Sequence, residues 1–274
     1  MRHRPEDLKQ MQSLPLDYKI MMTKQRIQAW YQTWTKFTIM DKETGKTRSV
    51  TIDARDFHWS EGKERFKMKD SEYIYEEMPG QVYVSFSGGK DSTVLKHIVD
   101  SMYSDVPALF VNTGLEYPEI QKFAMSQPNV ITVRPEMRFD QVLKEYGYPV
   151  IGKKQARFIR DLQNASNKNK ATVNLRLTGY NMAGKYCPTM KLADKWVPLK
   201  DAPFRVSEQC CDVMKKQPFK RYVKETGRRP ITATMADESE RRKLQWIRTG
   251  CNAFDTAEPI SKPMSFWTEQ DILH

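Results

Sequence analysis

The sequence predicts an α/β protein with a doubly wound parallel sheet, preceded by an N-terminal helix and a small β-hairpin. Three observations support this prediction. After residue 80, short apolar and β-branched runs alternate with stretches of helical spacing. The first run leads directly into Gly88 and Gly89 and then into a helix. Residues 1–78 lack this alternation, so we expect an N-terminal part at 1–78 and a main domain at 79–274.

The N-terminal part is expected to combine a helix with a hairpin. Apolar residues such as Ile20, Ile27 and Trp34 recur near helical spacing up to about residue 35. Two β-prone segments around a Gly-containing polar loop then indicate a strand, a turn and a second strand. We interpret residues 36–75 as an addition to the main domain.

The main domain has a signal for each of its elements. Its strands are short and apolar, and its helices begin near polar or proline residues and end near glycine. Residues 164–176 are polar and are expected to form a loop. The expected strands are 82–86, 107–112, 130–133 and 231–235, and the expected helices are 92–103, 118–126, 139–146 and 238–248.

Composition narrows the class of protein. The chain has 274 residues, 39% of them hydrophobic, and a net charge of +11. No apolar run is long enough to cross a membrane, so we expect a cytoplasmic protein with no membrane partner. The positive charge suits phosphate-bearing partners, either a nucleotide or a nucleic acid, although a solvated basic surface explains it equally well.

The stretch S-G-G-K-D-S-T at 87–93 has the composition of a phosphate-binding loop. Glycines let the backbone curl closely around an anion. The first N–H groups of the following helix have no partner within the helix and lie at the positive end of its dipole. Lys90, Ser92 and Thr93 add donors, and Asp91 can hold Mg²⁺ or cap the helix. A plain strand-to-helix turn is the alternative.

Three motifs resemble those of one family. Ser87-Gly88-Gly89-Lys90-Asp91-Ser92 resembles the pyrophosphate loop of the adenine nucleotide alpha-hydrolase superfamily. The T-G-L-E-Y-P-E stretch from Thr113 resembles the second signature of the phosphoadenosine phosphosulfate reductase family, and E-S-E-R-R from Glu238 resembles its later arginine segment. The resemblance covers roughly 200 residues and suggests a phage or bacterial branch of this family, with a sheet of the adenine nucleotide alpha-hydrolase type.

The resemblance implies roles for the matching residues. The ligand would be ATP or phosphoadenosine phosphosulfate, with Mg²⁺, and Arg242 would face its terminal anion; Arg241 is the alternative if the register differs by one. The catalytic residues implied are Lys90, Asp91 and Arg242. The nucleotide-binding residues implied are Ser87, Gly88, Gly89, Lys90, Asp91, Ser92, Thr93, Thr113, Gly114, Glu116 and Glu238.

Two reactions agree with the resemblance. One reduces a sulfonucleotide and needs a thiol or electron donor. The other cleaves ATP to AMP and pyrophosphate, which activates a substrate for sulfur transfer. A different class remains open, a non-catalytic nucleotide-sensing or nucleic-acid-binding component of a phage or defence system.

Four cysteines lie in the last third of the chain: Cys187, Cys210, Cys211 and Cys251. No C-x-x-C spacing is present, but four thiolates can hold a [4Fe–4S] cluster, or zinc, if the fold gathers them. The adjacent Cys210-Cys211 pair resembles half of the cluster motif of some sulfonucleotide reductases. Their catalytic E-C-G-x-H tail has no match here, so we expect a shortened chain or a reaction other than sulfate reduction. Buried apolar roles for some of the thiols are the alternative.

Overall fold

The structure, a computed structural model, describes residues 3–56 and 68–274. Its contacts divide the chain into two compact units. The first, which we call the core unit, comprises Met1–Val111, Glu116–Val133 and Arg221–His274. The second, the helical unit, comprises Asn112–Leu115 and Arg134–Lys220. The division into domains at residue 78 stays a prediction. None of the described helices is long and apolar enough to span a bilayer.

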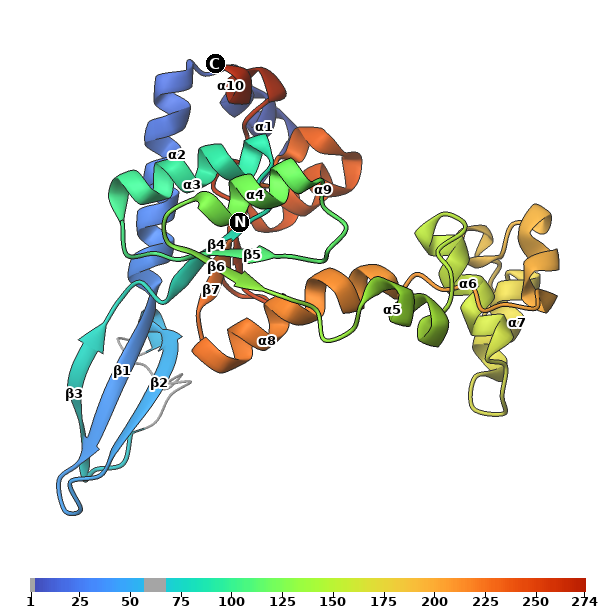
Figure 1. Ribbon diagram of the computed structural model, residues 1–274, viewed down its shortest axis with the longest axis horizontal. Coiled ribbons are helices and arrows are strands. Elements are labelled where there is room, and N and C mark those ends of the chain that lie inside the picture. The colour runs from blue at the N-terminus through green and yellow to red at the C-terminus, as the bar shows by residue number, and fades with distance from the viewer. Residues whose placement is uncertain (1–2, 57–67) are drawn as a thin grey trace. The chain divides into compact units, whose positions relative to one another are not determined.

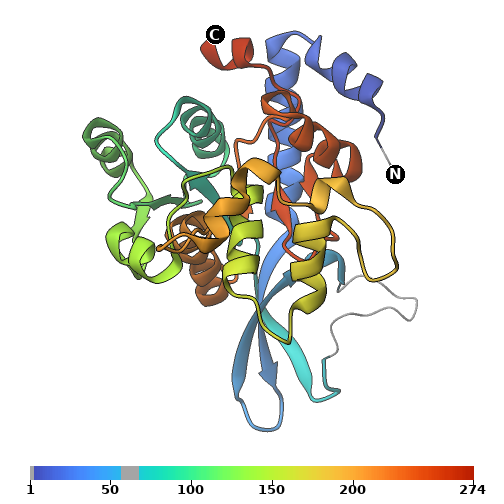
Figure 2. The same ribbon diagram turned by 90° about the vertical axis from the view of Figure 1, so that its right-hand side faces the viewer.

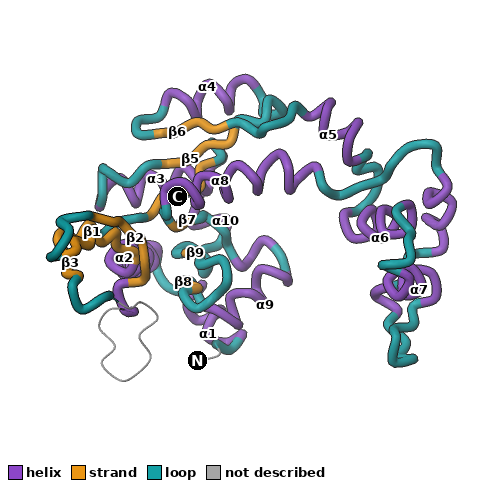
Figure 3. Tube along the Cα trace, turned by 90° about the horizontal axis from the view of Figure 1, so that it is seen from below, coloured by secondary structure: helices purple, strands orange, loops and turns teal. Residues whose placement is uncertain are grey.

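The core unit contains a six-stranded sheet that confirms the predicted α/β class. The strand order is β6-β5-β4-β7-β9-β8, and β8 is the antiparallel member. Figure 3 shows the labelled strands β6, β5, β7, β9 and β8 following one another in this order. The chain moves from β4 outward to β5 and β6, and β7 then pairs with the other side of β4. The strand bounds are β4 Val82–Phe86, β5 Ala108–Val111, β6 Val130–Val133, β7 Arg229–Ile231, β8 Asn252–Ala253 and β9 Ile260–Ser261.

Helices pack on both faces of this sheet, because alternate side chains of a strand point to opposite faces. Val82 and Val84 of β4 share a buried cluster with Leu95 of α3. Tyr83, which points the other way, meets Tyr222 of α8 with ring centroids 5.1 Å apart. Figure 1 shows α3 and α4 together on one side of the strands. The helices of the main domain have the bounds α3 Lys90–Met102, α4 Pro118–Ser126, α5 Phe139–Tyr146, α6 Lys153–Gln163, α7 Lys170–Thr178, α8 Gln217–Thr226, α9 Glu240–Thr249 and α10 Glu269–Leu273.

The N-terminal segment forms two helices and a three-stranded sheet, where one helix and a two-stranded hairpin were expected. The helices are α1 Pro5–Gln12 and α2 Leu16–Thr33, and β1 Trp34–Asp41 continues directly from α2. The sheet has the order β2-β1-β3, with β2 Thr47–Asp53 and β3 Glu72–Met78 (Figure 2). Most of β3 is exposed, so it lacks the apolar alternation that would have predicted it. Residues 57–67 of the expected addition lie outside the described residues.

Two other predictions were wrong. Much of the expected loop at 164–176 belongs to α7, whose Arg176 is buried against Asp161 at 3.0 Å and over the Phe158 ring at 4.0 Å. A tertiary ion pair of this kind stabilises a helix that its polar sequence does not announce. The strand expected at 231–235 is β7 Arg229–Ile231, and it begins and ends earlier. The chain leaves the sheet after Ile231 and enters a short 3₁₀ turn, η5 Ala236–Glu238.

The helical unit has its own small cores. One is formed by α6 with residues that follow it, including Leu192 and Val206. The other joins Val142 of α5 to Val213 and Met214 of a π-helical turn, η4 Asp212–Lys216. Two apolar clusters of this size suit a unit that consists mainly of short helices and turns.

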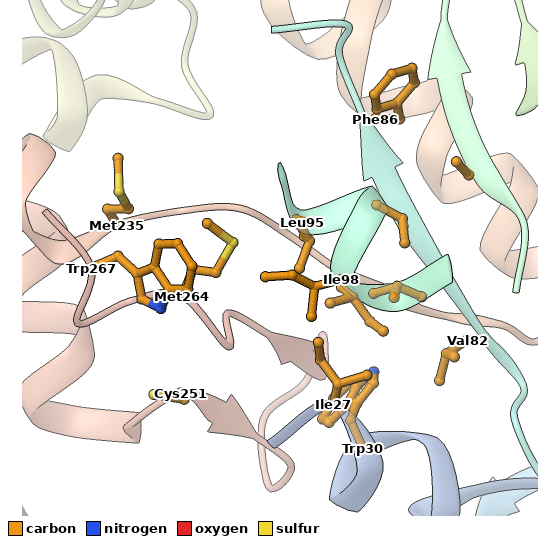
Figure 4. Packing of buried hydrophobic residues seen from close by; sticks show 14 of the residues in the cluster. Ile27, Trp30, Val82, Phe86, Leu95, Ile98, Met235, Cys251, Met264 and Trp267 are labelled. Atoms are coloured by element: carbon orange, nitrogen blue, oxygen red, sulfur yellow. The ribbon is translucent and has the colours of Figure 1, made fainter. Parts of the chain in front are cut away.

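The main core lies between the sheet and α2, α3 and the C-terminal segment. Figure 4 shows Ile27 and Trp30 of α2 beside Leu95 and Ile98 of α3, and Met264 beside Trp267. The Trp267 indole N–H donates to the Thr23 hydroxyl at 2.9 Å. The C-terminal segment is therefore part of the same core as the strands, and it brings β9 and α10 to the sheet.

Candidate functional site

Polar residues gather where β4, β7 and β9 end. Val84, Ile231 and Ser261 lie side by side across these three strands. The strands are parallel, so the segments that follow them emerge at the same edge of the sheet. The loop 87–93 follows β4, η5 and α9 follow β7, and Lys262 follows β9 directly. This edge lies wholly within the core unit.

The loop 87–93 is held by its own hydroxyl groups. The buried Ser92 hydroxyl donates to the Gly89 carbonyl at 2.9 Å and accepts from the Ser87 backbone N–H at 3.2 Å. The Thr93 hydroxyl donates to the same Gly89 carbonyl at 3.0 Å. These bonds fix the curve of the loop without using the N–H groups of Lys90 and Asp91, which the first turn of α3 leaves without partners inside the helix.

The two glycines of the loop have different backbone conformations. Gly88 has φ +75°, in the left-handed region, and a Cβ there would lie 3.0 Å from Ile120 Cγ2. Gly89 is the N-cap of α3 with φ −81° and ψ 163°, which any residue adopts. The nearest atom to a Cβ at Gly89 would be Ser87 Oγ at 3.5 Å. Gly88 is thus required for the turn itself, whereas Gly89 leaves room for a ligand to approach the backbone.

Lys90 and Asp91 place opposite charges at the start of α3. The Lys90 ammonium donates to Glu269 of α10 at 2.6 Å and lies 3.7 Å from Asp91 Oδ1. The hydrogen bond to Glu269 raises the pKa of Lys90, so Lys90 stays charged at neutral pH. Asp91 Oδ1 is itself buried and accepts no hydrogen bond. A buried carboxylate oxygen without a donor is a ready ligand for a cation.

Glu238 and Arg242 form an ion pair at the start of α9. Glu238 Oε1 also accepts from the Met235 backbone N–H at 2.9 Å. Ser239 caps α9 by accepting from the Arg242 N–H at 3.4 Å. The arginine segment that the sequence singled out follows β7, so it lies at the same edge of the sheet as the loop that follows β4.

Lys262 is a residue of this edge that the sequence analysis missed. Its side chain is buried, with 8% of the residue exposed. Burial, together with the positive charge of Arg242, lowers the pKa of Lys262 to about 8. A single lysine after a two-residue strand gives no local signal, so only the packing of β9 beside β7 reveals it.

The second motif is divided between the two units. Thr113 and Gly114 follow β5 in the helical unit, and Glu116, half-buried, belongs to the core unit. The Asn112 side chain accepts from the Gly114 N–H at 3.0 Å, and Thr113 Oγ1 accepts from the Leu115 N–H at 3.2 Å. These bonds define a polar turn after β5. The nucleotide-binding role that the resemblance implies for Thr113, Gly114 and Glu116 stays a prediction.

The four cysteines are divided between the two units. Cys251 is buried in the core unit, as Figure 4 shows, whereas Cys187, Cys210 and Cys211 belong to the helical unit. Burial raises the pKa of the Cys210 thiol, and its neighbour Cys211 adds to the effect. Among residues 3–56 and 68–274, no three Cys, His, Asp or Glu side chains are placed to hold a metal ion. The described residues give no support to the predicted iron–sulfur or zinc site.

A Mg²⁺ ion needs fewer protein ligands than an iron–sulfur cluster or a structural zinc ion. It is usually held by one or two carboxylates together with substrate phosphates and water. Asp91 Oδ1 meets the first of these requirements, at the loop expected to receive the phosphates. The residues present therefore fit Mg²⁺ that arrives with a nucleotide.

A glycine turn and cations at the carboxyl edge of a parallel sheet are typical of nucleotide-binding α/β proteins. Residues 81–173 match the family model of the phosphoadenosine phosphosulfate reductase domain, and this segment is similar to that domain. The match includes the loop and the second motif but ends before Arg242 and the four cysteines. No curated protein matches the chain.

Proposed function

We propose that this protein is an enzyme that cleaves ATP to AMP and pyrophosphate in order to activate a substrate for sulfur transfer. The observation that carries the proposal is the loop 87–93, inside the matched family segment, with its left-handed Gly88 and with Asp91 Oδ1, a buried oxygen whose charged neighbour is Lys90 at 3.7 Å. The loop supplies the geometry for a phosphate chain, and Asp91 supplies a ligand for the Mg²⁺ that accompanies ATP.

The chemistry asked of the chain is stabilisation of a leaving group. A nucleophilic atom of the substrate forms a bond to the α-phosphorus, and the bond from that phosphorus to the bridging oxygen breaks. Pyrophosphate leaves with the electron pair. The backbone N–H groups at the start of α3 and the cations of Lys90 and Arg242 would offset the charge that develops on it. Mg²⁺, when bound at Asp91, supplies further neutralisation of the phosphate oxygens.

The side chains of Lys90 and Arg242 are each paired with a carboxylate, which the phosphate of a nucleotide must displace. Lys90 is bound to Glu269, and Arg242 is bound to Glu238. Because Lys90 and Glu269 are both largely exposed, water screens their attraction and the pair is weak. A doubly charged phosphate chain competes well with so weak a contact. The carboxylates then act as temporary partners that keep the cations at the edge of the sheet.

Reduction of a sulfonucleotide is the second candidate, because the matched family is described by that activity. There a thiolate attacks the sulfur, the bond from sulfur to the phosphate oxygen breaks, and the nucleotide leaves. A second thiol then releases sulfite and leaves a disulfide. The same loop would hold the nucleotide's phosphate, so turnover rather than binding separates the two candidates.

The test is turnover of the full chain with two substrates. Pyrophosphate release from ATP and Mg²⁺, with candidate acceptors such as tRNA, supports the proposal. Sulfite release from phosphoadenosine phosphosulfate with a thiol donor supports reduction instead. Asp91→Asn should remove at least 90% of the activity, whereas Asp17→Asn, an exposed carboxylate of α2, should leave it unchanged. Salt-dependent nucleic-acid binding without turnover of either substrate would overturn both and point to a non-catalytic binder.

A further inference from the structure

Three lysines among the described residues are buried, and two of them have a carboxylate partner. Lys19 donates to Asp271 at 2.7 Å, and Lys96 is paired with Asp100. Lys262 is the third, and no described carboxylate pairs with it. The charge that acts on Lys262 is the like charge of Arg242. The Lys262 ammonium is not among the described side-chain atoms that are buried without a partner, so the buried stem carries it to the surface at this edge of the sheet. An anion that the chain itself does not provide can approach it there.

The position of Lys262 says where that anion belongs. Lys262 is one residue beyond Ser261, which lies level with Ile231 of β7 and Val84 of β4. Neighbouring strands are about 4.8 Å apart, so the ends of β4 and β9 are separated by about 10 Å. The loop 87–93 follows β4, and Arg242 follows β7 between the two. The side chain of a lysine is long enough to span much of this distance.

We propose that Lys262 is an anion-binding residue that acts together with Arg242 and takes the tetrahedral anion farthest from the nucleoside, beyond the phosphate held at the loop 87–93. This inference rests on the proposed nucleotide-binding function and narrows the substrate class. The ligand is a nucleotide with at least two tetrahedral anionic groups in its 5′ chain, such as a nucleoside triphosphate or a phosphosulfate. A nucleoside monophosphate has one phosphate, which would contact the loop 87–93 but not Lys262.

The described polar groups that bond to Lys262 contact its backbone and not its ammonium group. Its backbone N–H donates to the Cys251 carbonyl at 2.7 Å, and its carbonyl accepts from Ser265 at 2.6 Å. Both bonds fix the backbone and leave the ammonium group unused. Glu238 is engaged by Arg242 and by the Met235 N–H, so its charge is already shared.

The test compares Lys262→Met with wild type and with Lys224→Met, an exposed lysine of α8 that loses the same charge. Isothermal titration calorimetry measures the affinity of each protein for ATP, pyrophosphate and AMP. We expect Lys262→Met to lower the affinity for ATP and pyrophosphate by at least about tenfold, as for a lost charge-assisted hydrogen bond. The affinity for AMP should change less than twofold. Lys224→Met should match wild type, and Lys262→Arg should restore most of the ATP affinity.

A melting curve without ligand gives an independent measurement. Lys262→Met should melt no lower than wild type, because it keeps the apolar stem and removes a cation that has no carboxylate partner. Sulfate should raise the melting temperature of wild type more than that of the variant. If Lys262→Met binds ATP as tightly as wild type, or melts several degrees lower while Lys262→Gln does the same, the inference is wrong. If wild type itself binds none of the three ligands, the proposed function fails with it.

Discussion

Alanine at Gly88 and at Gly89 should have different effects on stability, although the two residues are adjacent. Gly88 has φ +75°, and a side chain in the left-handed region costs about 1–2 kcal/mol. The contact of its Cβ with Ile120 Cγ2 at 3.0 Å adds to this cost. Gly89 has an ordinary φ of −81°. There, the entropy that alanine removes from the unfolded chain roughly offsets the loss of a favourable N-cap residue.

The assay is thermal unfolding without ligand, followed by circular dichroism. Gly88→Ala should lower the free energy of unfolding by about 1–3 kcal/mol, or the melting temperature by roughly 3–8 °C. Gly89→Ala should stay within about 0.5 kcal/mol of wild type. Gly45→Ala separates the two causes, because Gly45 has φ +64° but no atom within 4 Å of its Cβ position. Equal melting temperatures for Gly88→Ala and Gly89→Ala would refute the reasoning about the turn.

Two further substitutions test the ion pairs of α10. Glu269→Gln frees Lys90, so ATP should bind two- to fivefold more tightly in calorimetry, and weaker binding would contradict the idea of a temporary partner. Asp271→Asn leaves Lys19 buried without its partner and should cost about 3–5 kcal/mol in urea unfolding. Burial alone would raise the pKa of Asp271, but hydrogen bonds from Lys19 and Thr268 outweigh it and lower the pKa. The contribution of Asp271 is therefore complete above its ordinary pKa near 4 and lost as the pH falls below it, so the difference between variant and wild type should shrink below pH 4; a constant difference down to pH 2 would contradict this.

Local signals predicted much of the fold. The helices 118–126 and 139–146 and the strand 130–133 have the bounds that were expected, because proline, glycine or a run of β-branched residues marks their ends. The third strand of the N-terminal sheet was missed because it is almost wholly exposed, and α7 because a distant carboxylate, Asp161, stabilises it. Such partners have no counterpart in the local pattern of the sequence.

The candidate site also contains residues that local sequence signals predict and residues that they do not. The loop 87–93 could be found because all its parts are consecutive: a strand, two glycines, hydroxyls and a helix. Glu269 lies 179 residues from Lys90 in the sequence, and Lys262 is separated from the loop by most of the main domain. Only the order of β4, β7 and β9 in the sheet brings them to one edge. Glu269 and Lys262 could therefore not be predicted from motifs, whereas Glu238 and its partner Arg242 lie in one motif.

Calorimetric titration of the full chain with a non-hydrolysable α,β-methylene analogue of ATP and Mg²⁺ tests the central claim most directly. The account predicts micromolar or tighter binding to wild type, weakened at least tenfold by Gly89→Ala, whose added methyl group occupies the space left for phosphate while its backbone stays relaxed. No binding to a folded wild type, or equal binding to Gly89→Ala, would contradict the claim that the loop 87–93 holds a nucleotide.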